Sequence, residues 1–150
     1  MKGFVTTKKR IGTITFALML VFAVFGAAMV RADTVNKQAQ LPQNAQNEQQ
    51  RVSFIQKLGY TVDTGVAEEK KEIVVPFTFS GVYKTYNDIQ KQAGYDLMRF
   101  CGKKVTVYTY KLSDKVRDDV YAHIITYDNS LIGGDIAAIS VEDGYMLPLN

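Results

Sequence analysis

The sequence has 150 residues, a formal net charge of +3 and a single cysteine, which excludes an intramolecular disulfide. Residues 1–31 hold five of the 18 basic residues and no acidic residue. The other 13 basic residues face 15 acidic residues, so residues 32–150 carry a net charge of −2. Nucleic-acid binding needs clustered positive charge, which this larger part of the chain lacks, and we expect no nucleic-acid partner.

The chain opens with a segment typical of membrane-directed proteins. Residues 1–10 are basic, and residues 11–30 form an apolar run without a charged side chain. Twenty helical residues span about 30 Å, roughly the hydrocarbon core of a bilayer, whereas the apolar region of a signal peptide has about 7–15 residues. This length favours a transmembrane anchor in contact with the lipid bilayer. The small residues towards the end of the run leave an alternative open, a signal peptide cleaved near Ala32 and a secreted product.

Charge predicts the orientation of such an anchor. Four Lys or Arg residues precede the apolar run and one follows it closely, so the positive-inside rule keeps residues 1–10 in the cytoplasm. The protein is then a single-pass protein of the cell membrane, with its C-terminal part outside. Residues 31–43 are polar and rich in Gln, and they have too little apolar surface to fold. We expect them to link the membrane segment to an extracytoplasmic domain of residues 44–150.

Two helices are expected in this domain. The first is Asn44–Leu58, with Asn44 as its N-cap and apolar residues recurring on one face. The second is Val82–Ala93, in which apolar residues step by four, three and four positions, and Gly94 ends it.

Alternating or continuous apolar runs, bounded by turn residues, predict the strands of the domain. The predicted strands are Glu72–Phe79, Lys104–Lys111, Val120–Tyr127, Leu131–Ser140 and, as a short last strand or tail, Tyr145–Leu149. Asp128-Asn129-Ser130 is typical of a turn, and Gly133-Gly134 indicates a bulge or a close backbone contact. The order of elements predicts an α+β domain, with an antiparallel sheet of about four strands and two helices packed on one face.

Several short motifs, in this order, resemble those of a known family. They are Phe54-Ile55 with Leu58-Gly59-Tyr60, Ile73 with Val75-Pro76, Tyr83 with Tyr86-Asn87, Gly94-Tyr95-Asp96-Leu97, Gly102-Lys103 with Val105 and Tyr108, and Ile132-Gly133-Gly134-Asp135. Over about residues 48–149 the chain is similar to the uncharacterised family catalogued as domain of unknown function 4830, found in exported or membrane-anchored proteins of Firmicute-type bacteria. The resemblance implies a compact domain outside the cytoplasm, and it assigns no catalytic or ligand-binding residue.

Patterns that would indicate catalysis or metal binding are weak. A Cys101–His123 dyad needs a thiolate beside a base, but no motif surrounds Cys101, and we expect it to be a small buried residue. Turn residues such as Asp128 and Asp143, together with Asp135, are calcium-type ligands, but their spacing matches no known loop. The chain has no Trp to stack on a sugar ring, which disfavours a glycosidase. We predict no catalytic residue, metal ligand or cofactor, and we favour a non-enzymatic protein over an enzyme.

Tyrosines offer the best candidate for a binding surface, because they combine an apolar body with a polar tip. Half-exposed strands also collect tyrosine for its strand propensity, which is the plainer interpretation. If a binding surface exists, we expect it on the sheet face that the helices leave uncovered, formed by Tyr108, Tyr110, Tyr121, His123 and Tyr127.

The sequence thus predicts a membrane-tethered extracytoplasmic domain that binds a protein or another envelope component without catalysis. One alternative is a cell-envelope enzyme whose site is scattered along the sequence. Another is a binder of a small apolar ligand or peptide, in a groove between helix Val82–Ala93 and the sheet.

Overall fold

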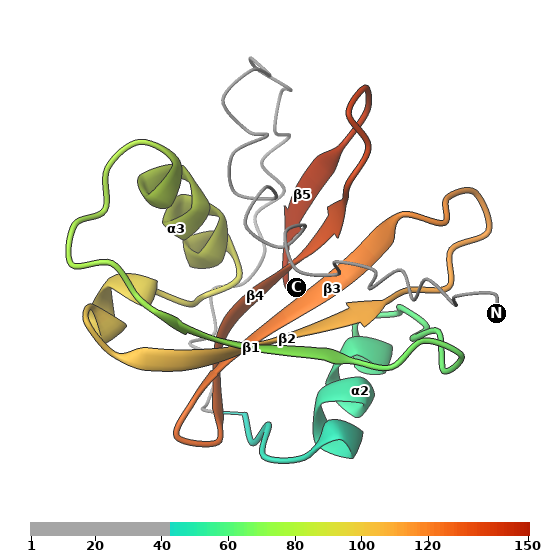
Figure 1. Ribbon diagram of the computed structural model, residues 1–150, viewed down its shortest axis with the longest axis horizontal. Helices are drawn as coiled ribbons and strands as arrows, with labels where there is room; N and C mark the ends of the chain where they lie inside the picture. Colours follow the sequence, from blue (N-terminus) through green and yellow to red (C-terminus); the bar gives the residue numbers. More distant parts are fainter. Residues whose placement is uncertain (1–42) are drawn as a thin grey trace, which may run out of the picture. The chain divides into compact units, whose positions relative to one another are not determined.

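The computed structural model describes residues 43–150. The basic N-terminus, the apolar segment of residues 11–30 and nearly all of the predicted linker lie outside the described residues. Within residues 43–150, no helix is both long and apolar enough to cross a membrane. This part of the chain forms two α-helices, one 3₁₀ helix and five strands (Figure 1).

Helix α2 (Glu48–Lys57) begins later than the sequence pattern predicts. Asn47 is the N-cap, because its side chain accepts a hydrogen bond from the Gln50 backbone N–H, while the Gln50 side chain accepts one from the Asn47 N–H. This reciprocal pair satisfies donors that the first helical turn leaves without a partner. The prediction that Asn44 caps the helix is wrong, since Asn44 forms an antiparallel bridge with Ser130.

The strands form one antiparallel sheet in sequence order, which confirms the predicted α+β class. Their bounds are β1 (Glu69–Val74), β2 (Lys104–Lys111), β3 (Val120–Tyr127), β4 (Ser130–Ala138) and β5 (Tyr145–Pro148). Helix α3 (Val82–Gln92) and the 3₁₀ helix η2 (Leu97–Phe100) connect β1 to β2. The sheet has five strands, one more than the approximate number predicted, and β2 and β3 have the predicted bounds.

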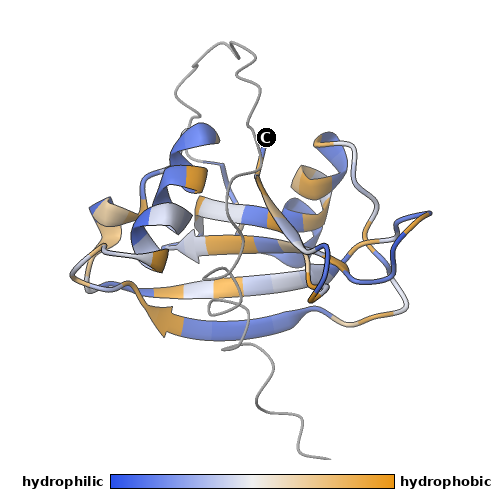
Figure 2. Cartoon of the chain, turned by 90° about the horizontal axis from the view of Figure 1, so that it is seen from above, coloured by the Kyte–Doolittle hydropathy of each residue, from blue (hydrophilic) through white to orange (hydrophobic). Residues whose placement is uncertain are grey.

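Strand β1 ends earlier than predicted. Its last residue is Val74, and the Val75 N–H makes one further hydrogen bond, 3.0 Å long, to the Lys103 carbonyl. Pro76 follows, and proline has no N–H with which to continue a ladder. At its other end β1 extends back to Glu69, so most of the strand is hydrophilic and only its end is hydrophobic (Figure 2).

The two helices cover opposite faces of the sheet, so the prediction that both pack on one face is wrong. Successive side chains of a strand point to opposite faces. Ala122 and Ile124 of β3 belong to the core cluster that α2 covers, whereas His123, between them, points to the face where Tyr86 of α3 contacts Asp135. Figure 1 shows α2 and α3 on opposite sides of the sheet. A helical pattern shows which residues of a helix are buried but not which face of the sheet buries them.

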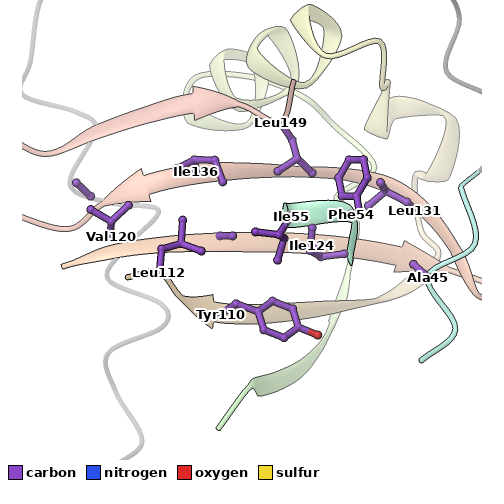
Figure 3. Packing of buried hydrophobic residues seen from close by; sticks show 12 residues of the cluster. Ala45, Phe54, Ile55, Tyr110, Leu112, Val120, Ile124, Leu131, Ile136 and Leu149 are labelled. Atoms are coloured by element: carbon purple, nitrogen blue, oxygen red, sulfur yellow. The ribbon is translucent and has the colours of Figure 1, made fainter. Parts of the chain in front are cut away.

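Each face of the sheet has its own hydrophobic cluster. Helix α2 inserts Phe54 and Ile55 over one face, where the buried residues of the strands include Tyr110, Ile124 and Ile136 (Figure 3). The other face carries a smaller cluster below α3 and η2: Val75, Leu97, Val105, Ile125 and Ile132.

The β3–β4 hairpin has the predicted turn and bulge. Asp128 and Asn129 have φ values of 48° and 61°, as in tight two-residue hairpin turns. The register then shifts, because Thr126 pairs with Leu131 while Ile125 pairs with Gly133. One extra residue of β4 therefore precedes the Gly133-Gly134 pair.

Candidate functional site

A buried carboxylate joins His123 of β3 to Tyr86 of α3. His123 and Asp135 are paired residues of the β3–β4 ladder. One oxygen of the buried Asp135 carboxylate lies 2.8 Å from His123 Nδ1, and the other accepts a hydrogen bond of 2.6 Å from the Tyr86 hydroxyl. An ionised carboxylate is costly to bury unless it is paired and hydrogen-bonded, so the three side chains form one unit.

Gly133 lets α3 approach β4 closely enough for this contact. A Cβ at Gly133 would lie only 2.7 Å from Gln90 Oε1. The same oxygen accepts a 2.7 Å hydrogen bond from the Gly134 N–H. Residues four apart lie on one face of a helix, so this contact also places Tyr86 over the sheet, where its hydroxyl meets Asp135.

The charges around the site favour a protonated His123. Burial by itself lowers the His123 pKa, but the charge and hydrogen bond of Asp135, together with the charge of Glu69, outweigh it and raise the pKa above its ordinary value. Burial, and then the charge and hydrogen bond of Asp135, hold the pKa of Tyr86 well above its usual range. The Tyr86 hydroxyl therefore keeps its proton and acts as a donor.

The second ring nitrogen of His123, Nε2, makes no hydrogen bond to a residue of 43–150. The His123 side chain keeps 12 % of its surface exposed. A protonated imidazole donates from both nitrogens, which leaves Nε2 as a donor while Nδ1 is held by Asp135.

The side chains around His123 form a partly exposed sheet surface. In the ladder Glu69 pairs with Thr109, and Thr109 pairs with His123. The next pair on the same face is Lys111 and Tyr121. Glu69 is exposed and the other four are partly exposed, and we call these five residues the His123 surface.

Comparison with known proteins agrees with the motif resemblance. The model of the family described as Domain of unknown function (DUF4830) matches residues 54–136, more than half of the chain. The chain belongs to the DUF4830 family. The matched region contains Tyr86, His123 and Asp135, so the site lies within the family's domain. No curated protein and no solved structure matches the chain.

The residues predicted to form one binding surface of this DUF4830 domain lie on two faces. Tyr108 and Tyr110 lie on the face that α2 covers, whereas Tyr121, His123 and Tyr127 lie on the other. Tyr110 is buried, and Tyr127 packs against the cluster below η2. Only Tyr121 and His123 remain together, as members of the His123 surface.

Tyr110 hydrogen-bonds to both members of an ion pair, between Arg51 and Glu68, that holds α2 on the sheet. The buried Arg51 of α2 donates to the Glu68 carboxylate at 3.0 and 3.1 Å, to the Tyr110 hydroxyl at 2.7 Å and to the Ala45 carbonyl at 3.0 Å. The Tyr110 hydroxyl in turn donates to Glu68. The guanidinium carbon also lies 3.6 Å from the centre of the Tyr108 ring, a cation–π contact. These groups satisfy one another, which indicates a structural role.

Cys101 and His123 do not form a dyad. Cys101 precedes the Lys104 end of β2, whereas His123 pairs with Thr109, about 17 Å further along the strand. Cys101 is also partly exposed, in contrast to the buried position predicted for it. Within residues 43–150, no three His, Cys, Asp or Glu side chains are grouped as a metal site would require.

Sequence reasoning did not select Tyr86 and Asp135 as partners of His123. Asp135 is the acidic residue of β4, in which every residue from Leu131 to Ala138 is buried. A lone acid in such a run is a signal for a carboxylate with a buried partner. Tyr86 lies on the apolar stripe of α3, and nothing local shows that its hydroxyl meets a carboxylate 49 residues later.

Proposed function

We propose that this DUF4830 protein is a membrane-tethered binding module that recognises an envelope component through the His123 surface, without catalysis. The observation that supports this most directly is the partly exposed ring of His123, which the buried Asp135 holds by Nδ1. A ring fixed in this way offers one hydrogen-bonding group in a set direction. Tyr121 adds an aromatic side chain of the kind enriched at interfaces.

The charges of the His123 surface suit an acceptor oxygen on the partner. The raised pKa of His123 extends the pH range in which Nε2 is a donor. Lys111 adds a second cation on the same face, and Glu69 lies at the far edge of the sheet. A carboxylate on an envelope protein or polymer therefore fits best, because it accepts hydrogen bonds and complements both cations.

A second candidate function is acid–base catalysis by His123. A histidine whose Nδ1 is held by a carboxylate is a common general base, and this arrangement is present here. Nucleophilic catalysis would also need a nucleophile beside the ring, whereas Cys101 lies at the other end of β2. The chemistry around His123 therefore suits recognition better than covalent catalysis.

The packing of α3 gives no support to an apolar ligand groove. Asn87 and Gln90 on its inner face are buried, and Asn87 donates to Asp96 at 2.9 Å and accepts from the Leu97 N–H at 2.8 Å. These polar side chains occupy the place where an apolar ligand would have to lie.

The proposed location is the outer side of the cell membrane. Residues 11–30 would cross the bilayer with residues 1–10 in the cytoplasm, on the length and charge arguments from the sequence. Cell fractionation combined with intact mass measurement tests this. The expected product is the full chain in the membrane fraction, and a soluble product that begins near Ala32 would show that the segment is cleaved.

Site-specific photo-cross-linking tests the binding role. A photoreactive amino acid replaces Tyr121 in the full-length chain in its native membrane. The matched control replaces Tyr83, which is 39 % exposed on α3 and lies outside the His123 surface. We expect a discrete adduct from position 121 that is absent from position 83 and is lost in a His123→Gln background.

Identical adducts from both positions would contradict recognition through the His123 surface. A position 121 that gives no adduct would also contradict it. If cells with the His123→Gln chain then had the same phenotype as cells that lack the gene, the acid–base candidate would be favoured instead.

A further inference from the structure

Large apolar side chains are exposed at one end of the sheet. Val74, at the end of β1, is 61 % exposed, Phe77 is 82 % exposed, and Met98 of η2 is 50 % exposed. Figure 2 shows the hydrophobic end of β1. Two backbone hydrogen bonds join the segment that follows β1 to the segment that precedes β2. The Val75 N–H donates to the Lys103 carbonyl at 3.0 Å, and the Gly102 N–H donates to the Val75 carbonyl at 2.9 Å.

The Phe77 ring has a defined position despite its exposure. A Cβ added at Gly102 would overlap the ring, so Phe77 rests directly on the glycine backbone. Gly102 has φ +70°, a conformation that favours glycine. The ring is therefore held outward by the fold.

Two exposed cations flank these apolar side chains. Arg99 of η2 and Lys103 are exposed, and neither has an ion-pair partner within residues 43–150. Their neighbour Lys104 is paired with Glu72 at 2.6 Å. We call Val74, Phe77, Met98, Arg99 and Lys103 together the Phe77 corner.

The chain enters the domain at the same end of the sheet. The Gln43 carbonyl accepts a hydrogen bond of 2.9 Å from the Leu131 N–H, just after the β3–β4 turn. Thr106, near the start of β2, pairs with Thr126, near the end of β3, so this turn and the Phe77 corner belong to one end of the sheet. In Figure 1 the end of β1, η2 and the β3–β4 turn all lie on the left.

We propose that the Phe77 corner docks on the phospholipid bilayer that holds residues 11–30, an inference that rests on the membrane anchoring proposed above. Residues 31–42 reach at most about 43 Å when fully extended, so the end of the sheet near Gln43 stays within that distance of the lipid. Phe77, Val74 and Met98 enter the interface, where they bury apolar surface, while Arg99 and Lys103 reach lipid phosphates.

The opposite end of the sheet differs in charge. It also exposes apolar side chains, with Val116 90 % and Val141 80 % exposed. The same two loops carry five acidic side chains: Asp114, Asp118, Asp119, Glu142 and Asp143. Arg117, which pairs with Asp119 and Asp143, and Lys115 offset only part of this charge, so the net charge of the two loops is negative. Negative charge repels lipid phosphates, so charge and the point of chain attachment select the same end for docking.

Single-tryptophan variants test the docking, because the natural chain has no Trp. The full-length protein is reconstituted in phosphatidylcholine–phosphatidylglycerol vesicles, with and without brominated acyl chains that quench Trp. We expect brominated lipid to reduce the emission of the Phe77→Trp variant about twofold or more, as for a side chain in the interface. The matched control, Val141→Trp at the opposite end, should be quenched by less than about a tenth.

Charge-reversed backgrounds test the role of the cations. Arg99→Glu with Lys103→Glu should abolish the quenching of the Phe77→Trp variant, whereas Lys115→Glu at the opposite end should leave it unchanged. Equal quenching of the two Trp variants, or no quenching of either, would overturn the docking. Of these two results, the absence of quenching would favour a protein partner or a second copy as the occupant of the corner.

An alkaline carbonate wash separates this proposal from the anchor. Quenching of Phe77→Trp in a chain that the wash releases would support docking and overturn the anchor. A chain that resists the wash without quenching at position 77 would support the anchor and overturn docking.

Discussion

Replacing Tyr86 with Phe tests whether the buried carboxylate holds α3 on the sheet. The change removes only the hydroxyl that donates the 2.6 Å hydrogen bond to Asp135, and the Phe ring leaves no cavity. A hydrogen bond to a charged group contributes about 1.5–3 kcal/mol, and Asp135 keeps His123 as its other partner. We expect the free energy of unfolding to fall by about 2 kcal/mol, which lowers the Tm by about 8 °C for a domain of this size.

The assay is urea unfolding of the full-length chain in mild detergent, followed by circular dichroism. The control is Tyr83→Phe, the same substitution three residues earlier on α3. The Tyr83 hydroxyl has no hydrogen-bond partner in the described part of the chain, so we expect a change within about 0.5 kcal/mol. Equal urea midpoints for the two variants would refute the reasoning, because the bond to Asp135 would then contribute nothing net.

Three further predictions follow from the same contacts. Because the folded-state pKa of His123 is raised above about 6.5, its contribution to stability is complete below that pH and is lost as the pH rises through the raised value. NMR titration of this single histidine, with urea unfolding at each pH, measures this dependence of stability on pH. The Asp135→Asn variant should have a lower His123 pKa and a weaker dependence of stability on pH. Arg51→Met leaves Glu68 buried in part without its cation, so urea unfolding should show a loss of about 3–5 kcal/mol, and a loss below 1 kcal/mol would contradict this. Gly134→Ala would drive a Cβ into the His123 carbonyl, and thermal unfolding should show destabilisation by more than about 2 kcal/mol.

Local patterns correctly predict strands β2 and β3 and the turn that follows β3. The bounds of β2 and β3 follow from side-chain alternation, and the turn at Asp128 and Asn129 follows from residues that tolerate positive φ. These features depend on neighbours along the chain, so a sequence window contains the information. The start of α2 was harder, because Asn44 and Asn47 are both acceptable N-caps and the bridge from Asn44 to Ser130 decides between them.

The site itself depends on contacts that are distant in sequence. His123 was predicted as a surface candidate, but its partners come from a different strand and a helix. The tyrosines predicted to form one surface lie on two faces because the pairing of β2 with β3 decides which face each side chain occupies. Tyr108 and Tyr110 of β2 lie on the face that α2 covers, and a shift of one residue along the strand would place them on the face of His123.

The sequence by itself determined the α+β class, the antiparallel sheet and the family to which the chain belongs, whereas the order of the strands came from the structure. The class, the sheet type and the family follow from periodicity and motif order, which are properties of neighbouring residues. Only the tertiary structure decided that α2 and α3 lie on opposite faces, and that Tyr86 and Asp135 close around His123. The physical reason is that an amphipathic helix buries its apolar stripe equally well on either face of a sheet, and the long-range partners of buried polar groups choose between them.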